Sequence, residues 1–384
     1  MPDKKPANGS IFTFLSTVAF VVGNTVGGGV LALPMVGNQG GFIPTVLACL
    51  LTGIMMSLSG LYLLKAFWKN EEILSLSGIY EHYFGRWGRR LFEFFFLFLF
   101  LCLLTAYFSG MAESMVTLFP FRSGGIRLGL FVIFGVLLAK GSSPLFLGNN
   151  ILTLGLALTF LFIVLQTFPH IQRQNLGTVH WKSFPTLLPI FLCSYGFHNT
   201  LPVLLRLTHH YYPMARNAVV TGSVIVFFIN FFFLWITLGN LSESTLRDAF
   251  LRGLPATLPL SQKLESPILF WAGITFTFLA IATSILTVGE SLLTFLRTRP
   301  IPPHFSLAIV LGIPFLATLS GHPLFLRALE LGGGIGCNII FGILPGYMGL
   351  RKGTTLGQRL SALILILLFG LLLWMEGVAK FSRT

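Results

Sequence analysis

Long apolar runs recur along this chain, and they constrain its fold more than any other feature. A helix needs about 20 consecutive apolar residues to cross a bilayer, and by that measure we predict eleven membrane-spanning helices. They are expected at 11–36, 41–66, 91–119, 126–139, 149–168, 184–206, 215–239, 267–296, 305–320, 323–350 and 358–379. The longest polar connection, 240–266, is expected to hold a short helix at Ser244 to Arg252. The pattern predicts an all-α polytopic membrane protein.

Composition supports this class and gives an orientation. Apolar residues make up 54% of the 384 residues and charged residues 10%, whereas a soluble domain carries about 25% charged residues. The net charge of +13 does not indicate nucleic-acid binding, because the basic residues lie in short loops between apolar runs. Fifteen of the 25 lysines and arginines fall on the side of the N-terminus. The positive-inside rule therefore favours a cytoplasmic N-terminus.

The first predicted span contains a polar, glycine-rich interruption, GNTVGGGVLALP, at residues 23–34. Glycine costs roughly 1 kcal/mol relative to alanine inside a helix, so the run is expected to loosen the backbone. Free backbone groups in a bilayer are tolerated only where they face protein or a cavity. In transporters such breaks hold the substrate and coupling ions. The alternative is tight helix packing, in which small residues let two backbones touch.

A second interruption, CSYGFHNTLP at 193–202, lies in the sixth predicted span. Breaks five helices apart are what an inverted repeat of spans 1–5 and 6–10 predicts. We therefore expect one integral membrane domain over 1–384, with repeats at 11–168 and 184–350 and an extra helix at 358–379. The positive N-terminal ends of half-helices can hold a carboxylate, and unwound carbonyls can hold a cation or an ammonium group. An α-amino acid carries both groups.

Two segments, GNTVGGGVLALP and SYGFHNTLP (194–202), carry a family resemblance, and AIATSILTV (280–288) and ILPGYMGLR (343–351) add weaker support. They resemble the first, sixth, eighth and tenth helices of the hydroxy and aromatic amino acid permease family, which includes bacterial tyrosine- and tryptophan-specific transporters. The resemblance implies a LeuT-type 5+5 inverted repeat with broken helices 1 and 6, within the amino acid-polyamine-organocation superfamily. It also implies proton-coupled uptake across the inner membrane.

The expected substrate site is the backbone of the two breaks together with one side chain of the third span. Tyr107 lies where a LeuT-type fold often has a substrate-contacting aromatic residue, with plain packing as the alternative. His198 is an ionisable residue inside the membrane, which makes it a functional candidate; otherwise it bonds a carbonyl freed by the break. The full set is Gly23, Asn24, Thr25, Val26, Gly27, Gly28, Gly29, Tyr107, Ser194, Tyr195, Gly196, Phe197, His198 and Asn199.

Three of these residues depart from the family pattern. Asn24 and Gly29 are not expected in the first motif, and Asn199 stands where the family more often has glycine. The departures bear on substrate choice within the aromatic class and beyond it.

Five residues are candidates for ion coupling. Glu113 and Glu290 lie within apolar runs and are proton-carrier candidates, with ion pairing as the alternative. Thr283 and Ser284 resemble the hydroxyl pair that ligates sodium in sodium-coupled relatives, although hydroxyls in membrane helices more often bond their own backbone. The candidates are Glu113, His198, Thr283, Ser284 and Glu290. Apart from a sodium ion at Thr283 and Ser284, no metal and no cofactor are expected.

The sequence thus predicts a secondary transporter that imports tyrosine or tryptophan by alternating access, coupled to H⁺ rather than Na⁺. Its partners are the amino acid, the ion and membrane lipid. Alternatives are a permease for another amino acid such as serine or threonine, Na⁺ coupling, or a channel or non-transporting scaffold. A channel is disfavoured because the polar residues concentrate at two breaks. An enzyme is not expected, since the glycine run at 332–336 follows no strand and does not indicate a nucleotide loop.

Overall fold

The computed structural model describes residues 11–118, 123–140, 142–252, 254–320, 322 and 324–381. Within these ranges the chain is almost entirely helical and contains no β-strand, only an isolated antiparallel bridge between Gly41 and Val179. The α-helices are α1 (Ile11–Thr25), α2 (Gly28–Gly37), α3 (Phe42–Lys69), α4 (Leu76–Leu118), α5 (Ser123–Ala139), α6 (Ser142–Thr167), α7 (Phe184–Ser194), α8 (Leu201–Leu207), α9 (Tyr212–Asn240), α10 (Glu243–Arg252), α11 (Thr257–Lys263), α12 (Pro267–Arg297), α13 (Pro303–Thr318), α14 (Phe325–Leu331), α15 (Leu344–Lys352) and α16 (Leu356–Phe381). The all-α prediction is confirmed.

Most of the predicted spans are present as long apolar helices. In the described residues, eight helical segments are long and apolar enough to cross a bilayer, and the bent pair α1–α2 makes a ninth. The shorter apolar helices α5 and α13 lie where the fourth and ninth spans are predicted. The chain is therefore a polytopic helical membrane protein. The eleven-span count and the inverted repeat stay predictions.

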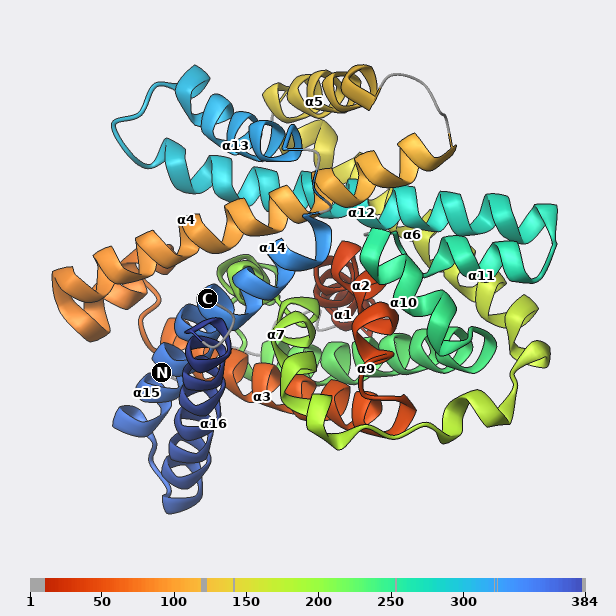
Figure 1. Ribbon diagram of the computed structural model, residues 1–384. Coiled ribbons are helices and arrows are strands. Elements are labelled where there is room, and N and C mark those ends of the chain that lie inside the picture. Colours follow the sequence, from red (N-terminus) through yellow and green to blue (C-terminus); the bar gives the residue numbers. More distant parts are fainter. Residues whose placement is uncertain are drawn as a thin grey trace.

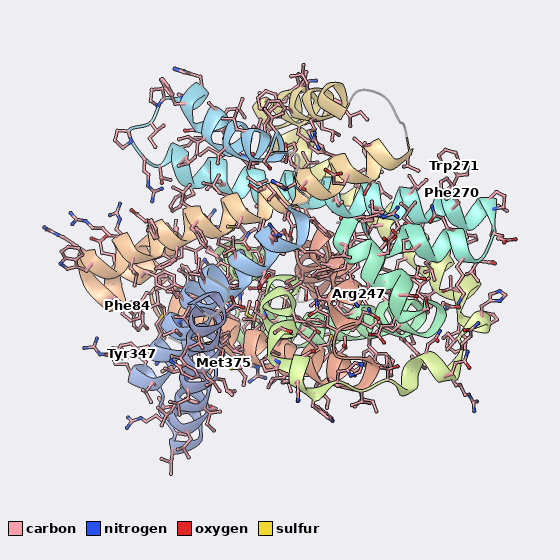
Figure 2. All side chains as sticks on the ribbon, viewed as in Figure 1. Phe84, Arg247, Phe270, Trp271, Tyr347 and Met375 are labelled. Atoms are coloured by element: carbon pink, nitrogen blue, oxygen red, sulfur yellow. The ribbon has the colours of Figure 1, made fainter. Side chains whose placement is uncertain are left out.

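The outer surface of the molecule is rich in large apolar side chains. Phe94 is 64% exposed, Trp271 60% and Trp374 65%. Figure 2 shows Trp271 and Phe270 at the periphery of the helices. Soluble monomers rarely expose large contiguous apolar patches, so a surface of this kind suits contact with lipid chains.

The two interrupted helices lie in the interior of the helix assembly. Figure 1 shows α1 and α2 near its centre, with α4 and α12 on one side and α3 and α9 on the other. α1 packs against α9, α2 packs against α7, and α12 packs against both α4 and α6. Both breaks are thus surrounded by protein rather than by lipid.

One helix begins earlier than the hydropathy pattern predicts. The sequence predicts a polar connection before residue 91, but α4 already starts at Leu76. Its backbone leaves the helical region at Gly85 (φ 70°, ψ −169°), a conformation that glycine adopts without a Cβ clash. Ile79 and Tyr80 in this first part are fully buried. The stretch also carries Glu81, Arg86, Arg89 and Arg90, so its hydropathy is too low to predict it as part of a membrane span.

The long connection after α9 holds two helices. The short helix predicted at Ser244 to Arg252 is present as α10. A second helix, α11, follows it and was not predicted. Asn38, at the end of α2, donates from its amide nitrogen to the carbonyl of Glu243 at 3.0 Å. The connection therefore lies against one end of the first interrupted helix.

The tenth predicted span contains a π-helix, η5 (Gly332–Ile343), between α14 and α15. π-helices are rare, occur mostly as single turns and are frequent at functional sites. A Cβ atom on Gly333 would lie 1.8 Å from the carbonyl oxygen of Pro189, and one on Gly336 would lie 2.8 Å from Cβ of Leu99. The glycine run therefore lets this wide helix lie directly against α7 and α4.

Candidate substrate-binding site

The first break separates α1 from α2 and bends the chain by 57°. α1 ends at Thr25 and α2 begins at Gly28, so Val26 and Gly27 lie outside both helices. The carbonyl of Gly27 accepts from the amide of Val30 at 3.1 Å. The interruption predicted from the glycine-rich sequence is present.

The glycines of this break are required by close approach to other helices. A Cβ atom on Gly27 would lie 2.1 Å from Oγ of Ser284, and one on Gly28 would lie 2.7 Å from Cδ1 of Tyr107. The amide of Gly28 donates to Oγ of Ser284 at 2.8 Å. Unwinding and tight packing, which the sequence offers as alternatives, therefore occur together.

The second break lies opposite the first. α7 ends at Ser194, a 3₁₀ turn, η4, spans His198–Thr200, and α8 begins at Leu201. A Cβ atom on Gly29 would lie 3.4 Å from Cα of Ser194. The start of α2 is thus in contact with the end of α7.

A cavity lies where the two breaks, α4, α12 and η5 meet, and the empty space among its lining atoms, including space open to the outside, is about 600 Å³. The predicted site residues that line it are Asn24, Thr25, Gly27, Gly29, Tyr107, Gly196, Asn199 and the ion candidate Ser284. The lining residues that were not predicted are Leu99, Phe100, Leu103, Cys193, Thr287, Val288, Cys337 and Phe341.

Helical spacing explains part of what the prediction missed. Leu103 and Phe100 precede Tyr107 by four and seven positions, so they share its face of α4. Thr287 and Val288 follow Ser284 by three and four positions on α12. A rule that extends each candidate along its own helix face would have found these four residues.

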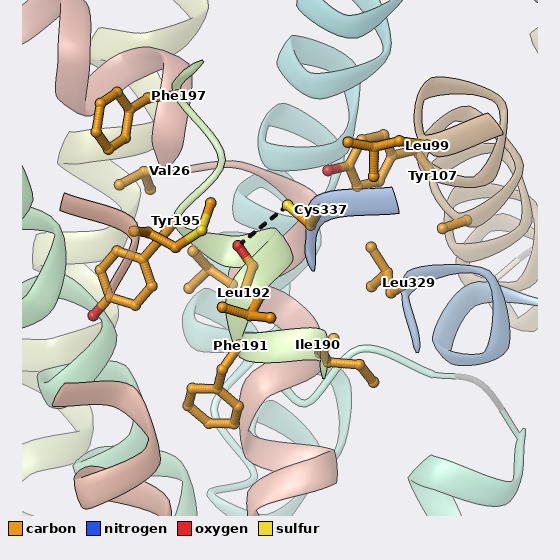
Figure 3. Close-up of a cluster of buried hydrophobic side chains, with 14 of the residues drawn as sticks. Val26, Leu99, Tyr107, Ile190, Phe191, Leu192, Tyr195, Phe197, Leu329 and Cys337 are labelled. Carbon is orange, nitrogen blue, oxygen red and sulfur yellow. Dashed lines mark hydrogen bonds between the residues drawn. The ribbon is translucent and has the colours of Figure 1, made fainter. Parts of the chain in front are cut away.

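The contribution of η5 has no such signal in the sequence. Cys337 and Phe341, four positions apart on η5, line the cavity, but no candidate was predicted on this span from which a face could be extended. The Cys337 thiol donates to the Leu192 carbonyl, with 3.9 Å between sulfur and oxygen, and so joins η5 to α7 beside the cavity. Figure 3 shows this contact, with Leu99 and Tyr107 on the far side of Cys337 from Leu192.

The other predicted site residues lie outside the lining. Gly28 is in close contact with the Tyr107 ring, which lines the cavity in its place. The Tyr195 side chain points toward α3, with 3.1 Å between its hydroxyl oxygen and the sulfur of Cys49. The predicted substrate-site residues absent from the lining are Gly23, Val26, Gly28, Ser194, Tyr195, Phe197 and His198.

His198 is a fully buried member of a three-ring stack. Its ring centroid lies 4.9 Å from that of Phe197 and 4.7 Å from that of Phe341, with interplanar angles of 27° and 13°. Nε2 lies 3.0 Å from Oγ of Ser59, whose hydroxyl donates to the Phe341 carbonyl. Because that hydroxyl has a single proton, Nε2 of His198 is the donor in its contact with Ser59. His198 thus supports the cavity wall from behind.

The carboxylates predicted for ion coupling have different surroundings. Glu113 forms an ion pair with Arg127, with 3.0 Å between Oε1 and Nη2. Oε2 of Glu290 is buried and has no hydrogen-bond partner among the described residues. Glu290 follows Thr287, a lining residue, by three positions on α12. Of the two, Glu290 is the one near the cavity wall with an unsatisfied oxygen.

The two hydroxyls predicted as a sodium site bond to helix backbone. Thr283 donates to the carbonyls of Leu279 and Ala280 at 2.9 and 3.1 Å. Ser284 donates to the Ala280 carbonyl at 2.9 Å and also accepts from the Gly28 amide. Both hydroxyls make the local backbone bonds usual for this residue type in membrane helices.

The internal cavity between two interrupted helices thus lies inside an apolar helical assembly of an integral membrane protein. The sequence model of the tryptophan/tyrosine permease family matches residues 11–376. The chain therefore belongs to the tryptophan/tyrosine permease family, a family of transporters and not of enzymes.

Individual relatives are similar over most of their length. The chain is 26% identical over 387 residues to tyrosine-specific transport system 2 of Haemophilus influenzae, covering 92% of this chain and 93% of the relative. It is 24% identical over 396 residues to the tryptophan-specific transport protein of Pseudomonas aeruginosa, covering 96% and 94%. It is also 26% identical over 294 residues to glutamine transporter 2 of Aliivibrio fischeri, covering 73% and 74%.

Proposed function

We propose that this protein imports an aromatic amino acid, tyrosine or tryptophan, across the inner membrane by cation symport with alternating access. The observation that carries the proposal is the meeting of two opposite helix ends at one cavity. The N-terminus of α2 carries a partial positive charge and suits the substrate carboxylate, while the C-terminus of α7 carries a partial negative charge and suits the ammonium group. The names of the tyrosine and tryptophan relatives supply the substrate class.

The cavity walls fit a zwitterion with a large apolar side chain. Backbone of the breaks, Ser284 and Asn199 form the polar part of the lining. Asn24, Thr25, Tyr107 and Thr287 add further polar groups, and the apolar side chains of the lining are Leu99, Phe100, Leu103, Val288 and Phe341. An aromatic substrate would place its charged groups at the breaks and its ring among these side chains.

Alternating access requires a cavity closed on one side of the membrane at a time. The connection after α9 packs over the end of α2, through Asn38 and Glu243. The lining runs along α12 from Ser284 to Val288, away from α11. With the predicted cytoplasmic N-terminus and eleven spans, the side of α2 covered by this connection would be external.

Glutamine is the second candidate substrate, because one relative is a glutamine transporter. Asn199, which lines the cavity, would be its natural partner, but its amide nitrogen already lies 3.2 Å from Oγ of Ser291. The apolar part of the wall, which includes Phe100 and Phe341, favours the aromatic substrate.

Uptake into proteoliposomes tests the function and its coupling ion. We expect labelled tryptophan or tyrosine to accumulate under an imposed proton gradient alone, with serine and glutamine excluded. Accumulation that requires a sodium gradient would contradict proton coupling and would assign the coupling ion to Thr283 and Ser284. Uptake of glutamine or serine without either aromatic amino acid would contradict the substrate assignment.

Replacing Glu290 tests the proton carrier. We expect Glu290→Gln to abolish accumulation driven by a proton gradient while preserving exchange of internal for external substrate, because the amide keeps the shape but cannot carry a proton. Both activities are measured in the same proteoliposomes. The matched control is Glu113→Gln, which removes an ion pair outside the cavity and is expected to preserve both. Gradient-driven accumulation by Glu290→Gln at the wild-type level would overturn the assignment.

A further inference from the structure

We propose that Phe341, on the π-helix η5, is the surface on which the aromatic ring of the substrate stacks, and that His198 is the residue that positions it. The inference rests on the proposed function and identifies the part of the site that recognises the side chain. It assigns substrate selection to the tenth predicted span, which lies outside both breaks.

The first observation is that Phe341 is held on its ring and on its backbone by the same pair of residues. The His198 ring lies nearly parallel to the Phe341 ring, at an interplanar angle of 13°. Ser59 accepts from Nε2 of His198 and donates to the Phe341 carbonyl. A neighbouring carbonyl, that of Ile340, accepts from the Tyr80 hydroxyl. Ring plane and main chain are therefore fixed together.

The second observation is that the stack is built into the fold. Phe197 lies on the other side of His198, with ring centroids 4.9 Å apart. A Cβ atom on Gly60 would lie 2.5 Å from Cζ of Phe197, so glycine on α3 makes room for this ring. Phe341 is the end of the stack that borders the cavity. A ring with a fixed orientation loses little conformational freedom when a ligand stacks on it.

The third observation concerns the other aromatic residues of the lining. Tyr107 packs against Gly28, and Phe100 stacks on Phe96 with centroids 4.0 Å apart, both on α4. The backbone carbonyl of Phe341 accepts a hydrogen bond from the Ser59 side chain. In the described part of the chain, no side-chain hydrogen bond of this kind is found at the carbonyl of Tyr107 or of Phe100. The structure thus favours Phe341 as the selecting ring.

A pair of substrate analogues isolates the effect of the aromatic ring. Phenylalanine and cyclohexylalanine have similar shapes, but only phenylalanine has a π-system. Aromatic pairing beyond buried area corresponds to a preference of roughly 2- to 12-fold. We expect the wild type to bind phenylalanine more tightly than cyclohexylalanine by a factor in this range. The measurement is competition of the two analogues with a labelled aromatic substrate in proteoliposomes.

The variants then separate contact from positioning. Phe341→Leu is expected to bring the preference close to 1 while the affinity for cyclohexylalanine changes little. His198→Ala should reduce the preference in the same way, and His198→Phe, which restores the stack, should recover it. If the Phe341→Leu protein is not monodisperse, the Phe341→Met variant is measured in its place, because unbranched methionine adapts to the volume that phenylalanine occupies.

The matched control is Phe369→Leu on α16. Phe369 packs against η5 at Gly342 but does not line the cavity, so its loss should leave the preference unchanged. An unchanged preference in Phe341→Leu, or a preference that is lost in Phe100→Leu and not in Phe341→Leu, would overturn the inference. A wild type that binds no aromatic amino acid would instead contradict the proposed function, so the two failures are distinguishable.

Discussion

Gly28→Leu is expected to abolish transport while the protein still folds and inserts into the membrane. A Cβ atom at this position would lie 2.7 and 2.8 Å from Cδ1 and Cε1 of Tyr107, and 3.6 Å from Cγ1 of Ile281. The larger leucine must push the Tyr107 ring into the cavity or force α2 away from Ser284. The first outcome fills the substrate space, and the second breaks the hydrogen bond from the Gly28 amide to Ser284 and displaces the N-terminus of α2. Overpacking of this kind costs typically about 1–3 kcal/mol, which is less than the loss needed to unfold most domains.

Uptake and exchange in proteoliposomes measure the effect, and monodispersity in detergent measures folding. The matched control is Gly370→Leu in α16, where an added Cβ atom meets no heavy atom within 4 Å. It makes the same change in a membrane helix away from the cavity and should retain transport. Wild-type uptake by a correctly inserted Gly28→Leu protein would contradict the site.

Gly333→Ala is expected to produce a large loss of stability for the addition of a single methyl group. Its Cβ atom would lie 1.8 Å from the oxygen and 2.7 Å from the carbon of the Pro189 carbonyl. Because the clash is with backbone, no side-chain rotation relieves it, and η5 must separate from α7. We expect a loss of at least about 1–3 kcal/mol, measured as a lower unfolding temperature and reduced monodisperse yield.

Gly377→Ala in α16 is the control for that substitution. No heavy atom lies within 4 Å of an added Cβ atom there, and alanine has the higher helix propensity. The control should therefore unfold at the wild-type temperature or above it. Equal unfolding temperatures for Gly333→Ala and the wild type would show that η5 does not lie against α7 as described.

Much of the fold follows from apolar run length and glycine content. The long helices lie close to the predicted spans because hydropathy depends on about 20 residues together, and single exceptions do not hide the signal. Both breaks were predicted because Gly27 to Gly29 and the 194–200 segment place polar and flexible residues inside such runs. The start of α4 was not predicted, because the short stretch that buries Ile79 and Tyr80 is also rich in charge.

The candidate site was predicted mainly at the breaks, and outside them only Tyr107 on α4 and Ser284 on α12 were predicted and line the cavity. Gly27, Gly29, Gly196 and Asn199 line the cavity as expected. His198 does not line the cavity. It was a candidate because it is ionisable, and that property does not indicate whether a side chain faces the cavity or lies behind its wall. Phe341 was not predicted, because no residue of the tenth span was a candidate and nothing in an apolar run distinguishes a phenylalanine that faces the cavity from one that faces lipid.

A structure determined with bound tryptophan or tyrosine tests the central claim most directly. We predict ligand density in the cavity between the two breaks, with the carboxylate at the N-terminus of α2, the ammonium group at the end of α7 and the ring against Phe341. Density at saturating ligand that lies elsewhere, with the space between Gly29, Gly196 and Phe341 empty, would contradict the account.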